Sequence, residues 1–277
     1  MSGSGQFAVA TPTLDELENL ARQAGIILRQ SYEPLPGAIN HLQIDYKGPI
    51  DLVTDVDRRS ENFLLRQIKE SYPEHRVIAE ESGALKGDPD HVWYIDPLDG
   101  TVNYAHGIPF FSVSIAYQEK GELALGVVYD PMRDECFSAE AGKGAWLNGK
   151  PIRPSSTQDL GHCLLTTGFP YNIRTNPNNN LDHYGRLSLL TQGVRRLGSA
   201  ALDCCYVACG RFDGYWENEV APYDVAAGGL IARQAGAIVT NLYGEADFLA
   251  PPLTILTAPP PIYAQLRDYF RQWFTRD

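Results

Sequence analysis

Two aspartates stand three residues apart where a predicted strand meets a tight turn. Asp96 and Asp99 follow an apolar, β-branched and aromatic run, residues 92–95, which is typical of a buried strand. Carboxylates this close repel each other unless a cation lies between them. Gly100 lets the backbone approach a ligand and leaves nearby amides free to donate. The pattern indicates a cation-binding turn, and an ordinary solvated turn is the alternative.

Further acidic residues recur at predicted strand ends and helix starts. Glu80 and Glu81 end one strand, Glu217 ends another, and Asp57 and Asp224 begin helices. Taken alone, each has an ordinary explanation, namely solvation for the glutamates and helix capping for the aspartates. Folds of the α/β type place ligands at strand carboxyl ends, so we expect these acids to meet. An all-oxygen ligand set suits Mg²⁺ bound together with a substrate phosphate, which predicts phosphoryl chemistry.

The composition argues against several other classes of function. The chain has 277 residues and a net charge of -11, which disfavours nucleic-acid binding because phosphate backbones require clustered Lys and Arg. Its five cysteines lack zinc-type spacing, so we expect reduced, mostly buried thiols in a cytoplasmic protein. We see no signal peptide and no apolar run of about 18 residues, so no membrane contact is expected. Neither a Ser/His/Asp set nor a Gly-x-x-x-x-Gly-Lys-Ser/Thr loop competes with the acids.

Alternating strands and helices must position these acids. Apolar residues at helical spacing predict helices over residues 13–32, 57–71, 181–190, 225–231 and 261–274. Apolar runs bounded by turn residues predict strands over residues 76–79, 92–95, 111–117, 123–129, 135–139, 144–147, 214–217, 237–240 and 254–257. Pro97 cannot donate to a sheet ladder, so we expect pairing to stop there. The length suits a single domain, residues 8–277, built from two packed halves of about 8–153 and 154–277.

Taken together, the motifs resemble those of the inositol monophosphatase family, the magnesium-dependent and lithium-sensitive sugar phosphatases. Residues 96–107 resemble the first family signature and residues 216–228 the second. Shorter motifs match at residues 51–54, 57, 80–82 and 198–201. The resemblance extends from about Leu14 onward. It implies a fold of the α+β / α/β class, a layered αβαβα sandwich of the sugar-phosphatase type, and a homodimer.

The resemblance also implies two or three Mg²⁺ ions in each active site. Glu80, Asp96 and the backbone carbonyl of Leu98 would hold the first metal. Asp96, Asp99 and Asp224 would hold the second, and Glu80 would also touch a weaker third. These five residues form the predicted metal-binding set.

Catalytic and substrate-binding roles follow from the same resemblance. Asp57 and Thr101 would orient and activate the attacking water, so that the predicted catalytic residues are Asp57, Glu80 and Thr101. The backbone after Asp99 would donate to the phosphate, and other groups would meet the substrate's hydroxyl side. The predicted substrate-binding residues are Asp99, Gly100, Thr101, Ala200 and Glu217. Glu219 is a candidate for altering substrate choice.

Three functional hypotheses stay open at this point. The first is hydrolysis of a phosphate monoester, with myo-inositol monophosphate favoured because residues 103–107 look closest to the inositol branch. The second keeps the chemistry and changes the substrate to fructose 1,6-bisphosphate, histidinol phosphate or 3′-phosphoadenosine 5′-phosphate. The third is a regulatory binding protein on a phosphatase fold. The intact set of acidic residues argues against a loss of catalysis.

Overall fold

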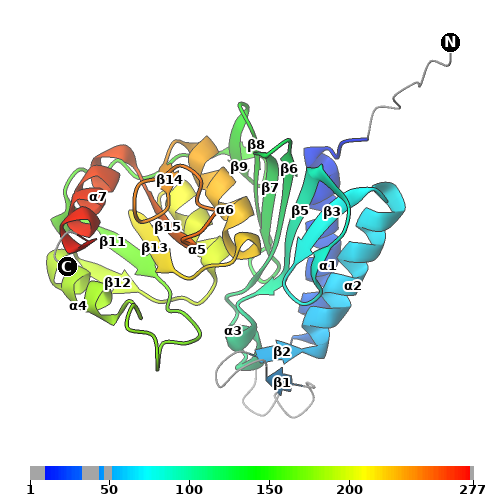
Figure 1. The fold of residues 1–277 in the computed structure, drawn as a ribbon, viewed down its shortest axis with the longest axis horizontal. Helices are drawn as coiled ribbons and strands as arrows, with labels where there is room; N and C mark the ends of the chain where they lie inside the picture. Colours follow the sequence, from blue (N-terminus) through cyan, green and yellow to red (C-terminus); the bar gives the residue numbers. More distant parts are fainter. Residues whose placement is uncertain (1–9, 33–43, 47–51, 275–277) are drawn as a thin grey trace.

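Helices and sheets alternate in layers in the computed structural model, which describes residues 10–32, 44–46 and 52–274 (Figure 1). Two helices cover the outer face of the first sheet, two lie between the sheets, and two cover the second sheet. In that spatial order the helices are α1 (Leu14–Ser31), α2 (Asp55–Ser71), α5 (Ala200–Ala208), α6 (Pro222–Ala235), α4 (Leu181–Leu190) and α7 (Pro260–Phe274). This arrangement confirms the expected αβαβα layering.

The first sheet contains eight strands in the order β10-β9-β8-β7-β6-β5-β3-β4. Neighbouring strands are antiparallel except β3 and β5, which run parallel. The parallel pair sets the end of β3 beside the middle of β5. The strands are β3 (His75–Ala79), β4 (Gly83–Leu85), β5 (Asp88–Asp99), β6 (Ser112–Glu119), β7 (Glu122–Asp130), β8 (Glu135–Glu140), β9 (Gly144–Leu147) and β10 (Lys150–Pro151).

The second sheet contains five strands in the order β12-β11-β13-β15-β14. β11 runs parallel to both of its neighbours, and β15 runs antiparallel to both of its own. The strands are β11 (Leu164–Thr167), β12 (Gly193–Arg195), β13 (Gly214–Asn218), β14 (Ile238–Thr240) and β15 (Thr254–Ala258). Smaller elements are the pair β1 (Ile44–Tyr46) and β2 (Leu52–Thr54), the helix α3 (Thr101–Ala105) and a 3₁₀ turn at Leu160–His162.

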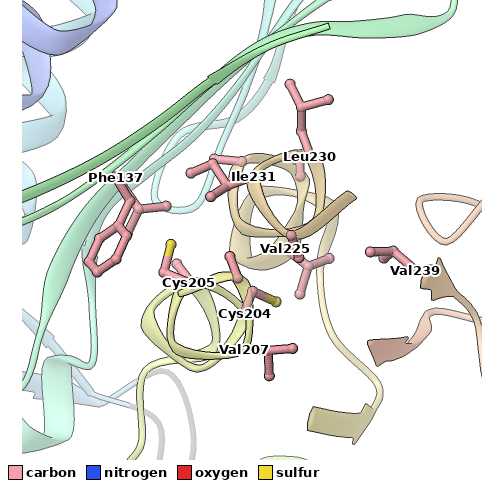
Figure 2. Packing of buried hydrophobic residues seen from close by; sticks show 14 of the residues in the cluster. Phe137, Cys204, Cys205, Val207, Val225, Leu230, Ile231 and Val239 are labelled. Carbon is pink, nitrogen blue, oxygen red and sulfur yellow. The ribbon is translucent and has the colours of Figure 1, made fainter. Parts of the chain in front are cut away.

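The apolar core between the sheets forms around α5 and α6. Figure 2 shows Phe137 of the first sheet facing these helices and Val239 of the second sheet on their other side. Close packing of the two helices depends on Gly228, because a Cβ there would lie 2.7 Å from Cys204 Cβ. All five cysteines are free, and four of them are buried, as expected. This core holds the two sheets together behind the acidic residues.

Several expectations fall outside what this fold decides. Residue 51 of one family-like motif lies outside the described residues. The division of one domain into halves near residue 153 stays a prediction. Within the described part of the chain, no helix has the length and apolar character that spanning a membrane would need.

Candidate active site

The ends of β3 and β5 bring two acidic motifs side by side. The strands run parallel, Ala79 pairs with Ile95, and Glu80 N donates to Ile95 O over 3.2 Å. Burial and then the charge of Glu80 raise the pKa of Asp96. A cation between the two carboxyl groups would relieve their repulsion.

β5 does not stop pairing at Pro97, so that expectation was wrong. A bulge interrupts the strand between Asp96, which pairs with Ser114, and Asp99, which pairs with Ser112. In a regular strand, side chains three residues apart would point to opposite faces. The extra residue in the bulge changes this alternation, and both aspartates line the same pocket. The bulge also accommodates a proline that the ladder would otherwise exclude.

All five predicted metal ligands line one pocket with a volume of about 230 Å³. They come from three parts of the chain, namely the end of β3, the bulge of β5 and the first turn of α6. The side chain of Asp224 accepts a 2.7 Å hydrogen bond from Ala221 N. Asp224 is the third residue of α6 rather than its N-cap residue, but this bond to the N-cap amide still caps the helix. The five residues are Glu80, Asp96, Leu98, Asp99 and Asp224.

Burial and mutual repulsion raise the pKa values of these carboxyl groups. The side chain of Asp96 is nearly inaccessible, and burial and then the charge of Glu80 hold its pKa well above the usual value. Burial and the charges of Glu80 and Asp99 do the same for the pKa of Asp224. Among the described residues that line the pocket, Arg196 is the sole cationic side chain. The site therefore holds acidic groups whose full ionisation the chain does not compensate.

Asp99 is held by the start of α5, which lies 100 residues further along the chain. Ser199 Oγ donates to its carboxylate, as do the amides of Ala201 over 3.0 Å and Ala200 over 3.2 Å. Burial raises the pKa of Asp99 to about 6, and these hydrogen bonds limit the rise. Ala200, a predicted substrate-binding residue, thus uses its amide to hold a predicted metal ligand.

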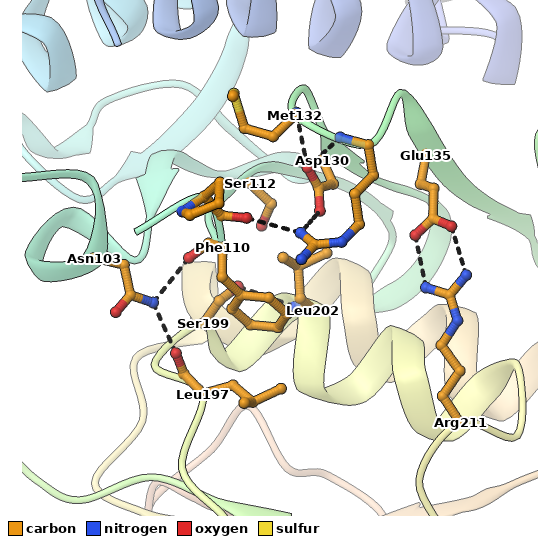
Figure 3. Close-up of polar contacts among 12 residues, drawn as sticks. Asn103, Phe110, Ser112, Asp130, Met132, Glu135, Leu197, Ser199, Leu202 and Arg211 are labelled. Carbon is orange, nitrogen blue, oxygen red and sulfur yellow. Dashed lines mark hydrogen bonds and ion pairs between the residues drawn. The ribbon is translucent and has the colours of Figure 1, made fainter. Parts of the chain in front are cut away.

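Polar contacts around α5 connect it firmly to the first sheet (Figure 3). Asn103 Nδ2 donates to Phe110 O over 2.8 Å and to Leu197 O over 2.7 Å. At the far end of the helix, Arg211 forms a two-pronged ion pair with Glu135, with one N–O distance of 2.6 Å. A two-pronged pair of this kind restrains orientation as well as distance. The helix that holds Asp99 is therefore fixed at both ends.

Thr101 connects Asp57 to the pocket. Thr101 Oγ1 lies 2.9 Å from Asp57 Oδ1 and 3.0 Å from Leu98 O, so its single proton serves one acceptor at a time. Asp57 itself is fully buried, caps α2 through Thr54, and does not line the pocket. Burial raises the pKa of Asp57 above its usual value. Capping and site roles thus coexist, and Asp57 reaches the pocket only through Thr101.

Gly100 makes the turn after Asp99 possible. Its φ of 96° lies in the left-handed region, and a Cβ there would lie 3.0 Å from Phe110 O and 3.2 Å from Gly198 O. A side chain would be disfavoured by both conformation and space. Gly100 and Thr101 line the pocket, as their predicted contact with a phosphate requires.

Glu217, on β13 of the second sheet, also lines the pocket. Tyr215 Oη donates to its carboxylate over 2.6 Å. Burial raises the pKa of Glu217 to about 7, although the Tyr215 bond and the charge of Arg196 oppose the rise. Gly168 faces this carboxylate so closely that a Cβ there would lie 2.1 Å from each of its two oxygens.

Sequence reasoning assigned no role to several residues that line the pocket. Ser199 holds Asp99, and its place at the N-cap of α5 was a usable signal. Asp203, which is 1% exposed, has a buried Oδ1 with no hydrogen-bond partner, and burial holds its pKa well above the usual value. Nothing in the local sequence marks Asp203, because only the packing of α5 turns it toward the pocket.

The donor set fits Mg²⁺ by chemistry and charge rather than by a ready coordination geometry. The predicted ligands are carboxylates and one backbone carbonyl, and hard cations prefer such oxygen donors. Within the described residues, no three His, Cys, Asp or Glu side chains already form a group that could hold a metal ion. Burial and the charge of Glu80 hold the pKa of Asp96 well above its usual value, and a bound cation would lower it.

Known proteins resemble this chain over nearly its full length. A model described as the inositol monophosphatase family matches residues 10–272. A Pasteurella multocida protein named Nus factor SuhB is 44% identical over 253 residues, which cover 90% of this chain and 92% of that protein. The solved structure of inositol monophosphatase from Anabaena (Nostoc) is 42% identical with a TM-score of 0.81, covering 94% of this chain and 95% of that one. The extragenic suppressor protein suhB from Bartonella henselae is 36% identical with a TM-score of 0.85, covering 93% and 97%.

Proposed function

Because this chain belongs to the inositol monophosphatase family, we propose that it hydrolyses a phosphate monoester in a Mg²⁺-dependent reaction, with myo-inositol monophosphate as the first candidate substrate. One observation carries the proposal: the five predicted metal ligands line a single pocket whose buried carboxyl groups repel one another. The solved relative named inositol monophosphatase supports it further. Lithium sensitivity and a homodimer are parts of the proposal that rest on family membership alone.

The chain's own residues would form two Mg²⁺ sites. Glu80, Asp96 and Leu98 O would hold one ion, and Asp99 and Asp224 would hold another together with Asp96. Bound Mg²⁺ supplies Lewis acidity, which neutralises charge on the phosphate and lowers the pKa of water. The hydrogen bonds from α5 to Asp99 keep that carboxylate oriented when the ion is absent.

Thr101 and Asp57 would prepare the attacking water. Thr101 Oγ1 can accept a hydrogen bond from water while it donates to Asp57, and Asp57 polarises that hydroxyl from behind. The water oxygen forms the new bond to phosphorus and the bond from phosphorus to the ester oxygen breaks. The departing alkoxide takes up one proton, which balances the proton that the attacking water gives up. The products are inorganic phosphate and the free alcohol.

A substrate panel tests this proposal. Phosphate release is measured for myo-inositol monophosphate, fructose 1,6-bisphosphate, histidinol phosphate and 3′-phosphoadenosine 5′-phosphate, with Mg²⁺ titrated and lithium added. We expect Mg²⁺-dependent release and the highest kcat/KM for the inositol ester, because kcat/KM ratios measure discrimination between substrates. If another ester has the highest kcat/KM, the proposed hydrolysis stands and that ester replaces myo-inositol monophosphate as the proposed substrate. No Mg²⁺-dependent release from any of the four would contradict the proposal.

One observation favours a second candidate function, that of a regulatory binding partner. Relatives more than 40% identical carry the name Nus factor SuhB. The net charge of -11 favours a protein partner over direct contact with nucleic acid. Pull-downs with the wild-type chain and with D96N separate the two functions. Equal capture of one stoichiometric partner by both proteins would support binding that is independent of catalysis, and capture of none would argue against it.

A further inference from the structure

The wall of the pocket beside Glu217 comes from a segment between β11 and α4, residues 168–180. Phe169, Pro170 and Tyr171 of this segment line the pocket. The side chain of Asn180 closes the base of the segment, donating to Gly168 O over 2.7 Å and accepting from Trp216 Nε1 over 2.7 Å. The base is therefore anchored in the core, and the middle of the segment needs other contacts to stay beside the pocket.

Glu219 supplies those contacts from the end of β13. Its carboxylate accepts hydrogen bonds from Asn172 Nδ2 over 2.8 Å and from Asn176 Nδ2. Asn218, the residue before it, donates to Asn178 O over 3.1 Å. The segment thus hydrogen-bonds to the same strand that carries Glu217.

The backbone of Glu219 has a conformation that side chains disfavour. Its φ is 57°, in the left-handed region that few residues other than glycine and asparagine adopt. Such outliers persist where surrounding contacts hold them, and they concentrate at functional sites. Here the conformation accompanies the two hydrogen bonds to the segment, and Glu219 itself lines the pocket.

We propose that Glu219 is a specificity-determining positioning residue that holds the 168–180 segment against the pocket. This inference rests on the proposed function and concerns how the pocket discriminates monoesters with one phosphate from bisphosphates. Residues 169–171 form a wall of the pocket that Glu217 and Glu219 also line. The two glutamates give this part of the lining acidic character, with Arg196 as the only cationic side chain among the described lining residues. A second phosphate there would meet like charges, so bisphosphates are selected against.

Trypsin sensitivity reports the position of the segment without any need for activity. Arg174 is exposed within the segment and precedes Thr175, which makes it a tryptic site. E219G removes the hydrogen bonds from Asn172 and Asn176, and each such bond makes only a modest net contribution to stability in water. We therefore expect the rate of cleavage after Arg174 to rise about fivefold. E70Q, which alters an exposed glutamate on α2, is the matched control and should leave that rate unchanged.

Exchanging donor and acceptor sharpens the test. In E219Q, the new NH₂ group faces one of the two amide donors, Asn172 or Asn176, and cannot accept its hydrogen bond. In N176D, a carboxylate faces the carboxylate of Glu219 and repels it. Each variant should therefore speed cleavage. In the double variant E219Q/N176D, the amide at 219 can donate to the carboxylate at 176, which should restore most of the slow rate. Failure of the double variant to slow cleavage below either single variant would contradict the direct contact.

Substrate choice is measured in the same variants as the ratio of kcat/KM for myo-inositol monophosphate to that for fructose 1,6-bisphosphate. We expect the ratio to fall about fivefold in E219G, mainly through KM, and to recover in the double variant. An unchanged ratio together with unchanged cleavage would overturn the inference. If the wild-type chain hydrolyses neither ester, the proposed function fails, whereas the cleavage rates still decide whether Glu219 holds the segment.

Discussion

Two parts of the pocket lining are built in different ways. Around Asp96 and Asp99, the carboxylates are buried, and backbone amides at the start of α5 hold Asp99. Around Glu217 and Glu219, a partly exposed segment, residues 168–180, is held by side-chain amides. Chemistry that every substrate shares needs a fixed arrangement, whereas recognition of the alcohol needs only a wall that can differ between relatives. The contrast predicts large, substrate-independent effects around Asp96 and Asp99 and smaller, substrate-dependent effects around Glu217 and Glu219.

The largest effect is expected for D96N, because Asp96 belongs to both proposed metal sites. Loss of several kcal/mol of charge stabilisation in the transition state corresponds to a fall of about 10³-fold in kcat/KM for every substrate. D15N, which alters an exposed aspartate of α1, is the control and should retain full activity. Kinetic assays over a Mg²⁺ titration check this. A loss confined to one substrate would break the comparison between the two parts of the lining.

The next largest effect is expected for T101A, which removes the hydroxyl between Asp57 and Leu98. Positioned proton transfer contributes about 10²-fold or more, so kcat should fall by about 10² with little change in KM. T101S keeps the hydroxyl and should retain most of the activity. Equal losses in the two variants would indicate that the methyl group, rather than the hydroxyl, matters at this position.

Removing Mg²⁺ should make stability depend on pH. Burial raises the folded-state pKa of Asp99 from 3.8 to about 6, so the folded chain binds this proton more tightly than the unfolded chain does. The metal-free protein should then lose stability as pH rises from about 4 to 6, by up to about 3 kcal/mol for this group. Denaturant unfolding in a chelator measures the slope, and saturating Mg²⁺ should flatten it. A metal-free protein that gains stability over this range would contradict the charge repulsion described for the site.

A smaller effect than that of D96N or T101A is expected for E217Q, which alters a predicted substrate-binding residue. One hydrogen bond to a charged acceptor corresponds to about tenfold in kcat/KM, and the loss should differ between substrates. The pKa of Glu217 is raised to about 7, so wild-type kcat/KM should rise with pH through that region as the carboxylate ionises. E217Q should lack this rise, and E70Q should keep it. A profile that is identical in the wild type and E217Q would remove Glu217 from substrate binding.

Much of the fold was readable from the sequence because its signals are local. The helix predicted over residues 13–32 forms as α1, Leu14–Ser31, and α4 spans the predicted residues 181–190. Strand ends carrying acids pointed to a shared site because parallel strands deliver their carboxyl ends to one edge. The layered architecture came from the family resemblance rather than from periodicity.

The remaining features depend on contacts that no local pattern records. A proline usually ends strand pairing, but the bulge after Asp96 lets pairing continue past Pro97. Only the pairing with β6 reveals this bulge. Asp203 reaches the pocket through the packing of α5, and Glu219 reaches Asn172 across a gap of many residues in sequence. The predicted roles of the individual ligands and of Asp57 stay predictions until the variants above are measured.

The anchoring of Asp99 by α5 has a consequence during synthesis. On the ribosome, Glu80, Asp96 and Asp99 emerge well before Ser199 and Asp224. Domains generally fold as units, so the acids of the first sheet would gain the α5 amides and the last carboxylate only once these later residues have emerged. A nascent chain would therefore lack the complete set of acids of the proposed phosphatase site until α6 has been translated.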